Sequence, residues 1–147
     1  MPGYPELDTE RMELLAVIHP DLHQGTYYTP WIAMQGRHKA IAKLYVGDIG
    51  QAGTVDLELQ EATDAVGTGA AAIAGKAVTQ LTQAGGDSND SCAINLRTEE
   101  MNAGANYDFI RARLDVLVAS ANVAVLILGN VPRYAPVTQT PWTEVIA

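Results

Sequence analysis

Strict alternation of apolar and polar residues is the feature that most constrains the fold of this chain. It covers residues 54–60 (TVDLELQ) and returns at residues 110–116 (IRARLDV). Successive side chains of a β-strand point to opposite faces of a sheet, so this pattern is typical of a strand with one face on a core and the other in water. The alternation therefore predicts a mainly β protein.

The length of 147 residues fits one domain with a core of its own. We expect an antiparallel β-sandwich or barrel, jelly-roll-like, over residues 27–130. Prolines near both ends predict extended segments outside this body. The expected N-terminal arm is residues 1–26, with Pro20 ending any regular structure in it, and the expected C-terminal arm is residues 131–147.

Several further strands are predicted along the body. Strands over residues 28–35, 39–46 and 54–62 follow one another closely and predict an antiparallel meander. Residues 64–84 combine alanines that favour helix with glycines that oppose it. For that region we expect a loop followed by a strand over residues 76–81.

The C-terminal part of the body predicts a hairpin. Its strands are residues 107–119 and residues 123–128, joined by a short turn at Ser120–Asn122. The second strand (VAVLIL) is apolar on both faces. Such a strand is covered on both sides, by its own fold or by a partner.

Charge narrows the classes of function. Nine Lys plus Arg face 17 Asp plus Glu, a net charge of −8. Without a basic field we expect no direct nucleic-acid binding and no association with a membrane surface. No signal peptide is expected, and the single cysteine, Cys92, is expected to be a small buried apolar residue.

Candidate chemical motifs fail on spacing. The segment Gly69–Lys76 has one residue too many between its glycines for a phosphate loop. His19 and His23 have metal-like spacing, but Pro20 between them disfavours a helix, and a polar turn is the simpler expectation. Residues 87–98 lack the glycine and the glutamate of a calcium loop. We therefore expect no catalytic residues, no metal site, no cofactor and no enzymatic activity.

Several segments together resemble a family of virion structural proteins of tailed bacteriophages. The segments are GTYYTPWI at residues 25–32, TVDLELQEATDA at 54–65, GTGA at 67–70, GKA at 75–77 and RYAP at 133–136. The resemblance spans roughly residues 25–136, and its motifs are structural rather than catalytic. The terminal arms lie outside it.

The resemblance implies a non-enzymatic capsid decoration, or cement, protein that binds and stabilises the phage head. Its partners would be the major capsid protein or neighbouring virion subunits, together with further copies of itself. Its location would be the virion head, after synthesis in the host cytoplasm. Two alternatives stay open: a head–tail connector or tail subunit, and, more distantly, a small-ligand or carbohydrate-binding β module that uses exposed aromatic side chains.

Candidate interaction residues are apolar or aromatic side chains in the arms and at the start of the body. We expect the arms to attach the protein to its neighbours, because buried apolar side chains stabilise such contacts. The candidates are Leu14, Leu15, Val17, Ile18, Tyr27, Tyr28, Trp31, Tyr134, Trp142, Val145 and Ile146.

Overall fold

The computed structural model describes residues 12–102 and 105–132. Almost all regular structure in them is β. The elements are β1 Met12–Tyr28, β2 Ile32–Ala33, β3 Arg37–Ile49, β4 Thr54–Ala62, β5 Ala71–Ala77, β6 Leu81–Thr82, β7 Ser91–Arg97, the short 3₁₀ helix η1 Thr98–Glu100, and β8 Phe109–Pro132. The strands pair antiparallel in one continuous sheet, and the predicted mainly β barrel or sandwich is confirmed.

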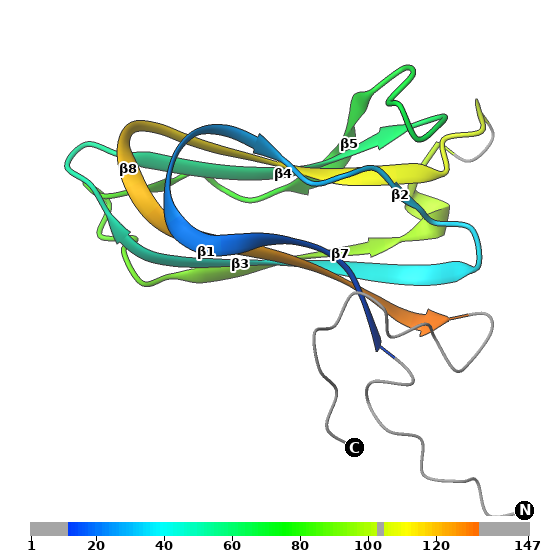
Figure 1. The fold of residues 1–147 in the computed structure, drawn as a ribbon, viewed down its shortest axis with the longest axis horizontal. Helices are drawn as coiled ribbons and strands as arrows, with labels where there is room; N and C mark the ends of the chain where they lie inside the picture. The colour runs from blue at the N-terminus through cyan, green and yellow to red at the C-terminus, as the bar shows by residue number, and fades with distance from the viewer. Residues whose placement is uncertain (1–11, 103–104, 133–147) are drawn as a thin grey trace, which may run out of the picture.

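The long strand β8 organises the sheet. Its first half, up to Leu117, pairs with β4, and its second half, from Ala121, pairs with β3. β1 follows β8 along both halves. β8 and β1 bend together around one end of the molecule and pass from one layer into the other (Figure 1).

Two layers result from this bend. The upper layer contains β4, β5, β6, the first half of β8 and the end of β1. The lower layer contains β3, β7, the second half of β8 and the start of β1 (Figure 1). On the side away from β1, Lys76 of β5 donates a 2.7 Å hydrogen bond to the carbonyl oxygen of Asn95 on β7. The sheet is therefore nearly closed into a barrel.

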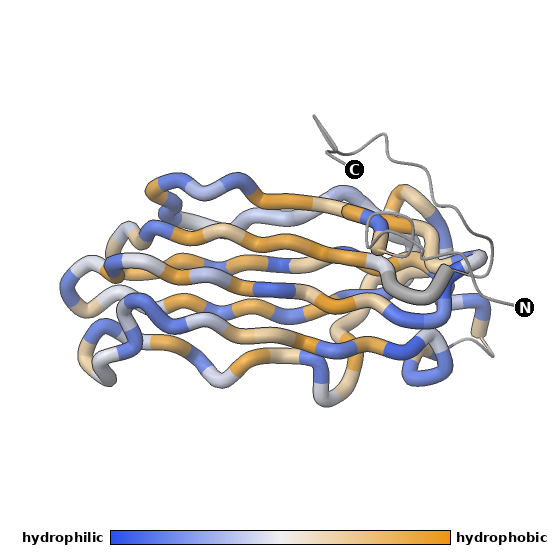
Figure 2. The backbone as a smooth tube through the Cα atoms, turned by 90° about the horizontal axis from the view of Figure 1, so that it is seen from below, coloured by the Kyte–Doolittle hydropathy of each residue, from blue (hydrophilic) through white to orange (hydrophobic). Residues whose placement is uncertain are grey.

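The core lies between the two layers and follows the predicted alternation. On β4 the side chains of Val55, Leu57 and Leu59 are fully buried, and on β8 Leu114 is their neighbour. The polar residues between them are only partly buried, and Figure 2 shows the alternation of hydrophilic and hydrophobic residues along the strands. Burial of one face at every second residue is what specifies the register of these strands.

Two predicted pairings are corrected by the structure. The hairpin expected at Ser120–Asn122 is wrong, because residues 109–132 form one continuous strand that bends instead of reversing. The meander is also wrong, because β3 and β4 do not pair with each other and each pairs with β8. Periodicity reports which face of a strand is buried and carries no information about the strand beside it.

Three segment boundaries are also corrected. Residues 12–26, expected as part of an arm, form most of β1 and pair with β8. Pro20 does not end this strand, because a register shift between Ile18 and Asp21 places it where no ladder hydrogen bond is needed. The strand expected over residues 76–81 is found at Ala71–Ala77. β8 extends to Pro132, and residues 133–147 of the expected C-terminal arm lie outside the described residues.

Candidate interaction surface

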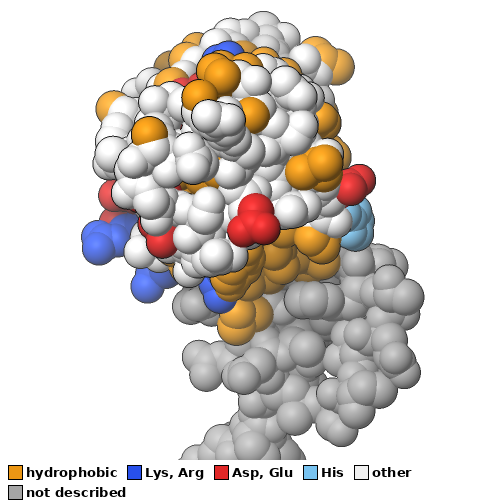
Figure 3. Space-filling view, turned by 90° about the vertical axis from the view of Figure 1, so that its left-hand side faces the viewer, with side chains coloured by type: hydrophobic (Ala, Val, Ile, Leu, Met, Phe, Trp, Pro, Cys, Tyr) orange, Lys and Arg blue, Asp and Glu red, His pale blue; other side chains and the backbone are white. Residues whose placement is uncertain are grey.

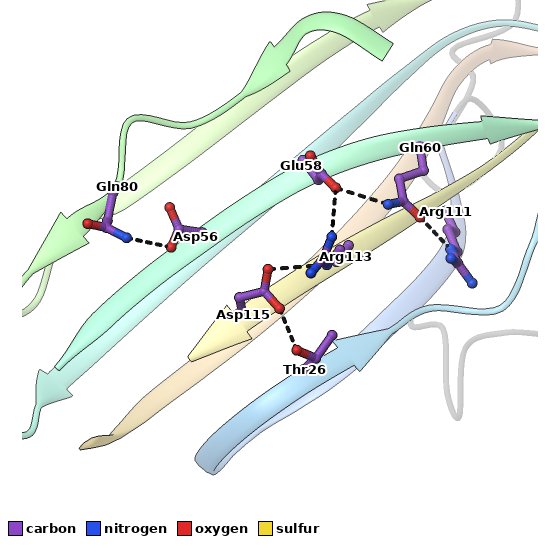
Figure 4. Close-up of polar contacts among 8 residues, drawn as sticks. All are labelled: Thr26, Asp56, Glu58, Gln60, Gln80, Arg111, Arg113 and Asp115. Atoms are coloured by element: carbon purple, nitrogen blue, oxygen red, sulfur yellow. Dashed lines mark hydrogen bonds and ion pairs between the residues drawn. The ribbon is translucent and has the colours of Figure 1, made fainter. Parts of the chain in front are cut away.

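The outward face of the upper layer is polar. Arg113 lies at its centre, with Nη1 3.6 Å from Oε1 of Glu58 and Nε 3.2 Å from Oδ2 of Asp115. The hydroxyl of Thr26 on β1 donates a 2.6 Å hydrogen bond to the same aspartate. These residues come from three adjacent strands and point toward one another (Figure 4).

The same network continues along β4 and β8. Gln60 donates to Oε1 of Glu58 at 2.9 Å and accepts a 2.8 Å hydrogen bond from Nε of Arg111. At the other end of β4, Gln80 donates to Asp56 at 2.8 Å (Figure 4). Exposed ion pairs of this kind contribute little to stability, typically about 0–1 kcal/mol each. The paired polar side chains make this outward face of the sheet compatible with water.

An aromatic stack lies at the edge of this polar face. The Arg111 guanidinium carbon is 3.9 Å from the centroid of the Tyr28 ring and 4.4 Å from that of Trp31. A cation between two rings is held by attraction to both π faces. Gly67 makes room for this stack, because a Cβ atom there would lie 2.6 Å from Nε1 of Trp31. Tyr28 nonetheless remains 47% exposed.

Tyr27 does not join this stack. Its ring is half-buried against the core, and its hydroxyl donates a 2.9 Å hydrogen bond to the carbonyl oxygen of Gln24. The ring of His23 packs edge-on against it at 4.6 Å between centroids. Among the described residues, the aromatic platform expected of a carbohydrate-binding module is therefore Tyr28 and Trp31, with Arg111 stacked on both rings.

On the outward face of the lower layer, β3 and β7 carry Lys39, Lys43 and Arg97, whereas β1, the second half of β8 and two positions of β3 form an apolar surface. We call this surface the apolar face, and hydrophobic side chains gather along the underside of this layer (Figure 3). Strand pairing brings these apolar side chains together. In one row, Leu128 of β8 pairs with Ile41 of β3 and with Leu14 of β1. In the next outward row, Leu126 of β8 pairs with Val17 of β1. The members of the apolar face are Leu14 and Val17 on β1, Ile41 and Tyr45 on β3, and Ala124, Leu126 and Leu128 on β8, with Lys43 among them.

Exposure varies along the apolar face. At the end where β1 begins and β8 ends, Leu14 and Leu128 are buried. At the opposite end, near the bend of β8, Tyr45 is 46% exposed. A hollow of about 490 Å³ lies beside this tyrosine, lined by Pro20, Asp21, Tyr45, Val46, Gly47, Asn122, Val123 and Ala124. We call this region the open end of the apolar face.

The described residues provide no metal centre. A ring nitrogen of His23 lies 2.9 Å from the carbonyl oxygen of His19, so the pair makes a local contact and does not converge on an ion. In the described ranges, no group of three or more His, Cys, Asp or Glu side chains is placed to hold a metal. Cys92 is half-buried. Burial is the largest cause that raises the pKa of its thiol, and the nearby carboxylates of Asp90 and Asp87 raise it further.

Apart from Tyr27, Tyr28 and Trp31, which are described above, the structure separates the candidate interaction residues into three groups. Leu14 and Val17 belong to the apolar face, whereas Leu15 and Ile18 pack against the core. A register shift between Leu14 and Ala16 explains why outward positions are three residues apart. The third group consists of residues outside the described part of the chain: Tyr134, Trp142, Val145 and Ile146.

Sequence reasoning did not select Tyr45 and Ile41 as candidate interaction residues. The signal that could have found them is the segment 123–128, which is apolar on both faces. Its outward residues extend an apolar surface onto whichever strand pairs with it. That strand is β3, and the pairing could not be known from local periodicity.

Among the described residues, no helix has the length and apolar character needed to cross a membrane. A scan against protein-family models and a search of curated proteins give no match to this chain.

Proposed function

We propose that this protein is a non-catalytic structural subunit that attaches to a larger assembly through the open end of its apolar face. The observation that carries the proposal is the chemical difference between the two outward faces. The upper layer carries charged side chains that pair with one another. The lower layer carries leucine, isoleucine, valine and tyrosine at the outward positions of β1, the second half of β8 and part of β3, with Lys39 and Lys43 beside them.

The open end has the features of a docking point. Tyr45 is half-exposed beside the small side chain of Ala124, which leaves its ring accessible above a hollow. Tyrosine is enriched among the residues that dominate binding energy, since it combines a large apolar ring with a polar hydroxyl. Asp21 and Asn122 supply a more polar rim. An apolar centre with a polar rim is the usual anatomy of an interface.

The resemblance to virion structural proteins of tailed phages supports a capsid shell as the assembly. The proposed partner is the major capsid protein, the proposed role is decoration of the head, and the proposed location is the virion. The polar upper layer would then face solvent. Where copies on one shell are linked to one another, their individually modest contacts combine into stronger overall attachment by multivalency. The net charge of −8 gives no attraction to packaged DNA.

The test compares two tyrosines of equal exposure on opposite faces. Tyr45→Ala removes the ring at the open end, and Tyr28→Ala removes a ring of 47% exposure on the upper layer. Binding of each purified variant to shells assembled from the major capsid protein of the same virus is measured by co-sedimentation. We expect Tyr45→Ala to weaken binding about tenfold or more, and Tyr28→Ala to bind like the wild type.

Loss of binding in Tyr28→Ala alone would overturn the assignment of the docking face and favour the aromatic stack. Equal binding by both variants would also contradict it. Imaging of the bound protein distinguishes decoration from a connector, because decoration repeats over the whole shell and a connector occupies one vertex.

A further inference from the structure

We propose that the end of the molecule at which β8 bends is an interaction surface for a protein partner that presents lysine or arginine beside apolar side chains. We call this end the bend end. It is formed by residues 19–25, 46–54, 82–91 and 116–123, where β8 and β1 pass from one layer into the other (Figure 1). Figure 3 looks onto this end.

Hydrogen bonds hold the segments of the bend end together. The backbone N–H of Gly50 donates to the carbonyl oxygen of Ser120 at 2.8 Å, and the Ser120 hydroxyl donates to Oε1 of Gln24 at 3.0 Å. The backbone N–H of Gln83 donates to the carbonyl oxygen of Gly53 at 3.1 Å. The bend end is therefore one connected surface rather than a set of separate loops.

Large apolar side chains are exposed at the bend end. Leu22 is 61% exposed, Leu117 45% and Val118 70%. Leu22 pairs with Asn122, on the far side of the bend that contains the other two residues. Single exposed apolar side chains are normal on a protein surface, whereas several at one end of a molecule mark an interaction site.

The backbone of Val118 gives independent support. Its φ of 71° lies in the left-handed region, which a β-branched residue rarely adopts, and its side chain is exposed. Backbone strain of this kind is concentrated at functional sites. The strained position displays an apolar side chain that adds little to the core, and contact with a partner accounts for this display.

The acidic charge of the bend end is not opposed by lysine or arginine. Its segments contain Asp21, Asp48, Asp87 and Asp90 and no basic residue other than histidine. All of these aspartates except Asp87 are exposed. Among the described residues, no lysine or arginine forms an ion pair with them. Charge complementarity therefore selects a basic partner and disfavours an acidic one.

Apolar side chains beside exposed carboxylates define the chemistry of the partner. Its surface must offer apolar side chains to the leucines and valine, with lysine or arginine near the aspartates. The bend end adjoins the hollow beside Tyr45, which Asp21 and Asn122 also line. The inference goes beyond the proposed function, because it does not depend on which assembly supplies the partner.

A second copy of this chain is the competing occupant. Lys39, Lys43 and Arg97 lie on the outward face of the lower layer and could meet the bend end of another copy. Such a contact would make the free protein associate with itself, so the concentration of the protein alone distinguishes this occupant from a different partner.

A titration with a short peptide tests the proposal. The probe is an amidated peptide with equal numbers of lysine and leucine residues, added to the full chain while backbone amide resonances are followed by NMR. We expect saturable shifts at Leu22, Leu117 and Val118. We expect none at Val66, which is 85% exposed in the turn after β4 and serves as the matched apolar control. Peptides with glutamate in place of lysine, or serine in place of leucine, should leave these resonances unchanged.

Variants separate the contribution of charge from that of apolar contact. Replacing both Asp48→Asn and Asp90→Asn should weaken binding of the lysine–leucine peptide about fivefold. Glu99→Gln should not change it, because this exposed carboxylate follows β7 at the opposite end of the layer. Leu22→Ser should also weaken binding, and the dispersion of each spectrum shows that the variant is folded.

Three results would overturn the proposal. The first is an absence of shifts at the bend end with the lysine–leucine peptide, and the second is a shift of equal size at Val66. The third is binding of the lysine–serine peptide as tightly as the lysine–leucine peptide. Shifts at the bend end that depend on protein concentration without peptide would also overturn it, by assigning the surface to a second copy.

Discussion

At the scale of single residues, Val118 marks the bend that makes two layers from one sheet. It has a positive φ of 71° and is 70% exposed. A β-branched residue in the left-handed region is a genuine outlier, because its Cβ crowds the backbone. The bend of β8 is thus made at a sterically unfavourable position, whose cost of about 1–3 kcal/mol is offset by the pairing on either side of it.

Replacing Val118 should relieve this strain. Asparagine tolerates the left-handed region, so we expect Val118→Asn to raise the free energy of unfolding by about 1 kcal/mol. Little apolar burial is lost, because the valine side chain is exposed. Chemical denaturation measures the effect. Leu117→Asn is the matched control, since Leu117 is exposed and has no positive φ, and a similar gain in that variant would contradict the explanation.

Glu100 links acid stability to the closure of the sheet. Its carboxylate accepts a 2.8 Å hydrogen bond from the backbone N–H of Arg97 and lies 3.0 Å from Nζ of Lys76. These two contacts, the backbone hydrogen bond first, hold the pKa of Glu100 below its ordinary value of 4.5. A lowered folded-state pKa stabilises the protein above the unfolded value, and this contribution disappears as the pH falls through the folded pKa.

We therefore expect Glu100→Gln to be less stable than the wild type at neutral pH. The difference in melting temperature should shrink as the pH falls below 4.5 toward the lowered pKa. Melting curves over a pH series measure it. Glu99→Gln is the control, because Glu99 is highly exposed and lies 3.7 Å from Arg97. A difference that grows on acidification would contradict the sign of the shift.

At the scale of elements, β4 was predictable and β8 was not. The alternation in residues 54–60 fixes the buried face of β4, because its inward and outward positions differ in polarity. The two halves of β8 are equally clear as strands. Their union was missed because Ser120–Asn122 has the composition of a turn, while the pairing of β1 across it keeps the chain extended.

The candidate surface was predictable only in part for the same reason. The segment 123–128, which is apolar at every position, indicates that an outward apolar face exists. Tyr45 joins that face only through the pairing of β3 with β8, which is a long-range contact. The N-terminal strand was missed because Pro20 is a poor strand residue, and a register shift accommodates it.

β1 supports both layers, so its removal should be more damaging than removal of the residues before it. We expect a protein lacking residues 1–11 to fold, because β1 begins at Met12. A protein lacking residues 1–24 should fail to fold, since it loses most of the strand that pairs with both halves of β8. Circular dichroism and a cooperative thermal transition measure this. Cooperative unfolding of the shorter protein would show that β1 is dispensable.

At the scale of the whole molecule, the fold presents two outward surfaces of different chemistry on opposite sides of one core. The upper layer carries paired charges, and the lower layer carries an apolar surface over β1 and the second half of β8. Monomeric proteins in water rarely expose a large apolar surface such as the one on the lower layer. The proposed attachment to a shell follows from this asymmetry.

The most direct test of this asymmetry is tyrosine footprinting on the assembled particle. Tyr45 and Tyr28 are 46% and 47% exposed in the free chain, so a tyrosine-modifying reagent should reach both. After attachment to shells of the major capsid protein, we predict that Tyr45 becomes protected and that Tyr28 keeps its reactivity. Protection of Tyr28 with Tyr45 still reactive would contradict the account.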